Sequence, residues 1–98
     1  MSIFSKKAAV PREVEELCKK RLSRVIERTG GEEITLGGKG GASVAGGELV
    51  IVCDGKEVFR CDIKGITAAQ LMSGNGCDIK GVSGGEKRHI TAYYGKNI

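Results

Sequence analysis

The first third of the chain carries apolar residues at helical spacing. These residues are Val14, Leu17, Cys18, Leu22, Val25 and Ile26. Pro11 suits the first turn of a helix, because an N–H at that position would have no intrahelical partner. Gly30 and Gly31 follow the last apolar position, and glycine is typical of a helix C-terminus. The pattern therefore predicts an amphipathic helix over residues 11–30, preceded by a flexible segment over residues 1–10.

After Gly31 the pattern changes to short extended segments separated by glycine turns. Asp54–Gly55 and Asn75–Gly76 are the strongest hairpin signals, because a tight hairpin turn needs residues that accept a positive φ. Gly46–Gly47 and Gly84–Gly85 are weaker signals of the same kind. The expected strands cover residues 32–36, 41–45, 48–53, 56–63, 66–73, 77–83 and 86–94. These segments predict an antiparallel meander with very short connections.

The turns on either side of the expected strand 77–83 fix a register for its neighbours. One turn places Met72 opposite Ile79, and the other places Ile79 opposite Ile90. Side chains opposite each other in an antiparallel pair lie on the same face of the sheet. The sequence thus predicts that these three residues share one core face.

The other face of the same strands is polar. It holds a candidate ligand-binding face made of Asp78, Lys80, His89 and Tyr93. His89 is the one side chain here whose usual pKa suits acid–base chemistry near neutral pH. The register places Lys80 beside it, and a neighbouring cation disfavours the protonated ring. Because the pattern places no serine or cysteine nucleophile next to His89, an exposed structural histidine is favoured and no catalytic residue is predicted.

The expected hairpin over residues 48–63 is apolar on both faces, so both faces need cover. One predicted face carries Val50, Val52, Phe59 and Cys61, and the other carries Leu49, Ile51 and Val58. One helix cannot cover all of this surface, and Arg21 lies within the apolar arc of the expected helix. The candidate interface is therefore Arg21, Leu49, Ile51 and Val58, and a homodimer is expected, because exposed apolar patches mark interfaces.

These elements predict an α+β fold in a single domain over residues 1–98. The N-terminal amphipathic helix is followed, over residues 32–94, by a six- to seven-stranded antiparallel meander. Such a meander should curl into a small barrel or a bent sheet, because curling reduces exposed edges. The strand number and length are similar to those of pleckstrin-homology-like barrels. The similarity is architectural only, because that fold ends in a helix and here the expected helix comes first.

The chain has 98 residues and a net charge of +4, and the charge is unevenly distributed. Residues 1–31 hold eight Lys/Arg and four Glu, whereas the remainder is balanced. A local positive field favours anionic partners such as nucleic acid or an anionic membrane surface. The candidate anion-binding residues are Lys20, Arg24, Arg28 and Lys87. An ordinary solvated helix face is the interpretation that the sequence favours for this charge, because helix faces of mixed charge are common.

Other patterns argue against particular kinds of site. The four cysteines form no Cys-x-x-Cys pair, so no metal site is predicted, and no cofactor motif is present. The glycine-rich segment 37–41 lacks the spacing of a phosphate-binding loop and is interpreted as a flexible hairpin loop. The longest apolar run, Leu49–Cys53, is far shorter than the ~20 residues of a membrane-spanning helix. Unpaired cysteines and the absence of a secretory signal favour a cytoplasmic protein.

The sequence favours a non-catalytic module for protein interaction or self-assembly. The first alternative is a binder of nucleic acid or anionic lipid that uses the basic helix. The second alternative is a small enzyme or ligand-binding barrel that uses the polar face around His89.

Overall fold

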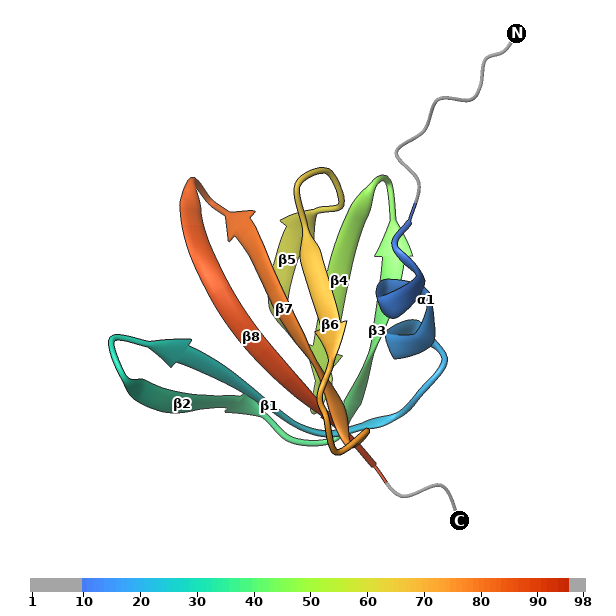
Figure 1. Ribbon diagram of the computed structural model, residues 1–98, viewed down its shortest axis with the longest axis vertical. Coiled ribbons are helices and arrows are strands. Elements are labelled where there is room, and N and C mark those ends of the chain that lie inside the picture. Colours follow the sequence, from blue (N-terminus) through green and yellow to red (C-terminus); the bar gives the residue numbers. More distant parts are fainter. Residues whose placement is uncertain (1–9, 96–98) are drawn as a thin grey trace, which may run out of the picture.

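The chain folds into one short helix followed by eight strands of an antiparallel sheet (Figure 1). The computed structural model describes residues 10–95. The elements are α1 (Arg12–Cys18), β1 (Leu22–Thr29), β2 (Glu32–Gly37), β3 (Gly40–Ala45), β4 (Glu48–Cys53), β5 (Lys56–Asp62), β6 (Thr67–Gln70), β7 (Gly76–Ser83) and β8 (Glu86–Tyr94). Apart from Val10, the segment predicted to be flexible lies outside the described residues. Within residues 10–95, no helix has the length and apolar character needed to cross a membrane.

The predicted helix over residues 11–30 is wrong beyond Cys18, because β1 occupies its second half. The helical spacing of Leu22, Val25 and Ile26 has another cause. A β-bulge between Leu22 and Arg24 adds one residue, so Leu22 and Val25 both face the core, and Ile26 faces the other side. Gly30 and Gly31 both have positive φ and form the β1–β2 turn, not a helix C-cap.

The strand bounds predicted from the glycine turns are correct for most of the remaining strands. The bounds of β2, β3, β4, β5, β7 and β8 agree with the predicted ranges to within one residue. The exception is β6, which is shorter than expected. It ends at Gln70, and residues 71–75 form a longer connection to β7. Met72 lies in this connection, fully exposed, and Ala68 is the residue opposite Ile79. The predicted pairing of Met72 with Ile79 is therefore wrong, whereas the pairing of Ile79 with Ile90 is confirmed.

The sheet is not a simple meander. Its strand order is β5-β4-β3-β1-β8-β7-β6, and β2 pairs only with β1. Two three-stranded units, β3–β4–β5 and β6–β7–β8, are joined through β1 in the middle. The sheet bends so that β5 contacts β7, and α1 packs against β3, β6 and β7 (Figure 1). Of the two expected forms, the structure shows the bent sheet and not a closed barrel.

A second bulge changes which residues of the β4–β5 hairpin share a face. Ile51 lies opposite Phe59, but Val52 lies opposite Glu57, so Val58 is the extra residue. Phe59 is therefore on the same face as Leu49 and Ile51, and all three side chains are buried in the core. The predicted division of faces is wrong from this bulge onward. Leu49 and Ile51, with no exposed surface, are unavailable as interface residues, and Val58 is half-buried.

The glycine-rich segment 37–41 allows two parts of the backbone to approach closely. A Cβ atom on Gly40 would overlap the carbonyl oxygen of Val52, and one on Gly37 would overlap the Cβ of Cys53. The Asp54 N–H donates to the carbonyl of Lys39 (2.8 Å), which fixes the segment against the end of β4. The segment is thus an ordered crossing between β2 and β3, which differs from the flexible hairpin loop that we expected.

An ion pair on the core side of the sheet connects three strands. Arg88 on β8 donates two hydrogen bonds to the Glu27 carboxylate on β1, both 2.8 Å long. The Arg88 guanidinium also lies over the Phe59 ring of β5, 5.1 Å from its centroid. The hydrogen bonds from Arg88 lower the pKa of Glu27 and outweigh burial, which acts in the opposite direction. This contact holds the bent sheet together at the side facing β5.

We expect Gly40→Ala to lower the free energy of unfolding by about 1–3 kcal/mol, because the new methyl group would overlap backbone atoms that cannot move independently. Gly41→Ala is the matched control, because a Cβ there meets open space. Urea denaturation of both variants measures the difference. Equal stability of the two variants would contradict the close approach at Gly40.

We expect Glu27→Gln to destabilise the fold by ~1–3 kcal/mol at pH 7, because the charged bidentate pair with Arg88 is lost. A lowered pKa in the folded state means that the carboxylate stabilises the fold above its usual pKa of 4.5 and loses this effect as the pH falls through the lowered value. The difference from wild type should therefore shrink at pH 3. Denaturation at both pH values tests this, with Glu32→Gln, an exposed carboxylate on the neighbouring strand β2, as the control. A deficit for Glu27→Gln that is the same at pH 3 and pH 7 would refute the role of the charge.

Candidate functional site: a basic and aromatic cleft

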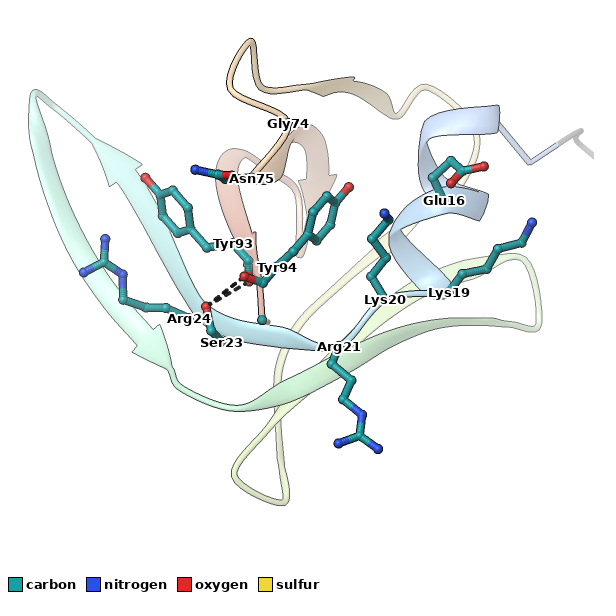
Figure 2. A pocket seen from close by; sticks show the side chains of 11 residues that line it. Glu16, Lys19, Lys20, Arg21, Ser23, Arg24, Gly74, Asn75, Tyr93 and Tyr94 are labelled. Atoms are coloured by element: carbon teal, nitrogen blue, oxygen red, sulfur yellow. Dashed lines mark hydrogen bonds between the residues drawn. The ribbon is translucent and has the colours of Figure 1, made fainter. Parts of the chain in front are cut away.

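A cleft lies at the end of the sheet where the chain passes from α1 into β1 (Figure 2). The end of β8 and the β6–β7 connection form its other wall. Its volume is about 1090 Å³, and its lining residues are Glu16, Lys19, Lys20, Arg21, Ser23, Arg24, Gly74, Asn75, Tyr93, Tyr94 and Gly95. The cleft therefore combines basic and aromatic side chains from segments far apart in the sequence.

Backbone hydrogen bonds fix the segments that form the cleft. The Gly95 N–H donates to the carbonyl of Arg21 (2.8 Å), which joins the end of β8 to the start of β1. The Tyr94 N–H donates to the carbonyl of Asn75 (2.7 Å), which attaches the β6–β7 connection. Ser23, the bulged residue of β1, donates from Oγ towards the Tyr93 and Tyr94 carbonyl oxygens, each 3.3 Å away. Two main-chain hydrogen bonds thus hold the walls of the cleft, and the Ser23 hydroxyl adds a side-chain contact.

Two basic side chains lie over the two tyrosine rings. Lys20 Nζ is 5.1 Å from the centroid of Tyr94, and Arg24 Cζ is 5.0 Å from the centroid of Tyr93. Both distances are within the range of favourable cation–π contacts, about 6 Å. The Tyr94 hydroxyl donates to Gln70 Oε1 (2.7 Å), and burial raises the pKa of Tyr94 despite this contact. The rings therefore position the cationic groups at the cleft, and Tyr94 is itself anchored by Gln70.

The cleft is electrostatically positive. Four of its lining residues are basic, and Glu16 is the one carboxylate among them. Lys19, Lys20, Arg21 and Arg24 are exposed, and none forms an ion pair with another residue of the described range 10–95. Because their charge is not neutralised locally, the cleft attracts anions.

The polar face predicted around His89 also exists, as a hydrogen-bonded network on the outer side of β1, β8 and β7. Arg28 Nε donates to Thr91 Oγ1 (3.1 Å), and Thr91 Oγ1 donates to Asp78 Oδ1 (2.6 Å). His89 Nε2 lies 3.2 Å from Asp78 Oδ2, but this buried nitrogen makes no well-aligned hydrogen bond. Lys80 is the cross-strand neighbour of His89, as the sequence predicted.

Within this network Asp78 acts as an acceptor. Burial raises the pKa of Asp78, but the hydrogen bond from Thr91 and the nearby His89 and Arg28 side chains together outweigh burial and lower it. Cys77 on the same strand faces the core, opposite Ala92, and is no neighbour of the His89 ring. The geometry is that of a network that holds three strands together, and it gives no support to a catalytic role for His89.

The structure divides the predicted anion-binding residues. Lys20 and Arg24 both line the cleft, although neither lies on a helix. Arg28 instead pairs with Glu33 (2.5 Å), and Lys87 lies six residues before Tyr93 on β8. Six residues of an extended strand correspond to ~20 Å, so Lys87 lies well away from the cleft.

Residues from the other two predicted groups also reach the cleft. Arg21 was assigned to an interface and Tyr93 to the polar ligand face, and both line the cavity. Sequence reasoning missed Lys19, Tyr94 and Asn75 as members of the site. The adjacent tyrosines at the end of an expected strand were a usable signal, but it required knowing that β8 pairs with residues 22–27.

The cysteines show no sign of functional reactivity. All four are free thiols, and Cys53, Cys61 and Cys77 are buried. Burial raises the pKa of Cys61 and of Cys77 to about 11, so both thiols stay protonated at neutral pH. Among residues 10–95 no three His, Cys, Asp or Glu side chains are grouped as metal ligands would be.

Comparison with known proteins adds no relationship, because no protein-family model, curated protein or solved structure matches the chain.

Proposed function

We propose that this protein is a non-catalytic binding module for an anionic macromolecule and that the basic and aromatic cleft is its binding site. The observation that carries the proposal is that Lys20 and Arg24, which form no ion pair within residues 10–95, lie over two tyrosines in a cavity lined by two further basic residues. From the sequence, binding of an anionic partner was the first alternative, and its expected place was the face of a helix. We now place the binding site at the α1–β1 junction.

The construction of the cleft supports binding of a charged polymer. Long basic side chains lose conformational freedom when they bind, and this loss opposes affinity. The contacts of Lys20 with Tyr94 and of Arg24 with Tyr93 restrict these side chains in advance. Because the walls are fixed by main-chain hydrogen bonds, a ligand meets a site that is already formed. Several basic groups in one cleft also suit a ligand with repeated anionic groups better than a single small ion.

Self-association, which we expected from the sequence, has weaker support. It depended on apolar surface at Leu49 and Ile51, and both side chains are buried within one chain. The large exposed apolar residues of the described range are Ile34, Val44, Val52, Met72 and Val82, and they lie on five different segments. We therefore place polyanion binding first. We keep the cytoplasmic location as part of the proposal, supported by the free thiols.

Heparin, a polyanion without aromatic groups, tests the proposal directly. We expect Lys20→Gln combined with Arg24→Gln to weaken heparin binding about tenfold, which corresponds to ~1.4 kcal/mol, and to flatten its dependence on salt. Isothermal titration at several salt concentrations measures both effects.

The matched control combines Lys64→Gln with Lys87→Gln, which removes the same charge from exposed positions. Lys64 lies between β5 and β6, and Lys87 lies near the β7–β8 turn, at the opposite end of the sheet from the cleft (Figure 1). Equal weakening by the two double variants would show that net charge, and not the cleft, determines binding. Melting temperatures of both variants establish that the fold is retained.

A further inference from the structure

We infer that the macromolecule bound in the cleft is a single-stranded nucleic acid. In this arrangement a base stacks on the Tyr93 ring, and the neighbouring phosphates contact Arg24 and Lys20. The inference rests on the proposed function and adds to it the chemical class of the ligand.

The aromatic residues favour this class over other polyanions. A sulfated polysaccharide or a polyphosphate needs only cationic groups and gains little from a tyrosine ring. Nucleic-acid bases stack on tyrosine and on planar arginine side chains, and such stacking does not depend strongly on sequence. Tyr93 is partly exposed, and the Arg24 guanidinium lies 5.0 Å from its ring centroid. A partly exposed ring and a cationic group are therefore neighbours at the cleft.

Asn75 supplies a polar group beside the Tyr93 ring. Figure 2 shows its side chain between those of Tyr93 and Tyr94, along the wall formed by β8 and the β6–β7 connection. Within the described part of the chain, the Asn75 amide makes no side-chain hydrogen bond, so its donor and acceptor are both available. An amide group can pair with the hydrogen-bonding edge of an unstacked base. A sulfate or a lone phosphate group would use only its donor.

The cationic groups of the cleft accompany two adjacent rings. Lys20 lies over Tyr94 and Arg24 lies over Tyr93, so each ring has its own cation. A polymer with one phosphate per base can contact both cations. A duplex would present its phosphates but keep its bases stacked inside, so the tyrosine would remain unused.

A membrane surface is the main competing ligand. Met72 is fully exposed in the connection that also carries Gly74 and Asn75 of the cleft. One methionine beside basic residues provides little insertion, because interfacial binding scales with buried apolar area. The tyrosines, by contrast, lie in the cleft and not at the tip of the connection. The observations therefore favour the nucleic acid, and vesicles of phosphatidylserine and phosphatidylcholine become part of the test.

The decisive comparison uses two ligands with identical charge. One is a fluorescein-labelled oligothymidylate of about 12 nucleotides, and the other is an abasic strand with the same number of phosphates. We expect fluorescence anisotropy to show about tenfold tighter binding of the strand that carries bases, because stacking is lost in the abasic strand. Since both strands bind unmodified protein, the result does not depend on the folding of any variant.

Two substitutions at one position assign this preference to Tyr93. Tyr93→Leu should abolish the difference between the two strands, whereas Tyr93→Phe, which keeps the ring, should retain most of it. Equal binding of both strands by unmodified protein would overturn the inference. The proposed function would survive that result if heparin binding still depended on Lys20 and Arg24. Failure of the inference about nucleic acid is thus distinguishable from failure of the proposed polyanion binding. Tighter binding to anionic vesicles than to the oligonucleotide, reduced by Met72→Ser, would overturn the inference in favour of a membrane.

Discussion

The fold depends on the close approach of two backbone segments at the bend of the sheet. Gly37 and Gly40 lie so near to Val52 and Cys53 that side chains at either glycine would collide with them. Because β2 can leave β1 and cross to β3 at this point, the two three-stranded units lie on either side of β1. The bend encloses one core, to which β4, β5 and β7 contribute Leu49, Ile51, Cys53, Phe59, Cys61, Cys77 and Ile79. A bulkier residue at Gly40 would push β3 away from its partner β4 at the point where the chain crosses from β2, and it would disturb the packing of the core there.

The positions of the hairpin turns were the part of the fold that could be predicted most directly from the sequence. Residue pairs that accept positive φ mark the hairpins at Gly30–Gly31, Gly46–Gly47, Asp54–Gly55 and Gly84–Gly85, so most strand bounds were predictable from local composition. Asn75–Gly76 is the exception, because Gly76 already belongs to β7 and the positive φ falls at Gly74. Bulges were not predictable in this way, because an extra residue at Ser23 or Val58 leaves no compositional mark. The bulge in β1 produced a spacing of apolar residues that is indistinguishable from one turn of a helix. The bulge in β5 exchanged the two faces of a strand, so residues assigned to an interface belong to the core.

The candidate site was predictable in its parts but not as a whole. Lys20, Arg24 and Tyr93 were all identified as residues of interest, yet they were assigned to separate hypotheses. They meet only because β1 pairs with β8, and the hydrogen bond from Ser23 to Tyr93 spans 70 positions of the sequence. No local pattern specifies such a pairing, since it is determined by which strands complete the bent sheet. Once residues 22–29 were interpreted as a helix, the two sides of the cleft could not be brought together.

The construction of the cleft from residues near 20 and near 94 has a thermodynamic consequence. The basic residues and the tyrosines are neighbours only when all the strands between them are in place, so an unfolded or half-folded chain contains no such site. A ligand of the cleft would therefore bind the native state alone and would raise the free energy of unfolding in proportion to the logarithm of its concentration. The fraction of the protein that has ligand bound and the fraction that is folded therefore depend on each other. In a domain of this size, whose total stability is only about 5–15 kcal/mol, the bound ligand becomes a substantial part of what keeps the sheet bent.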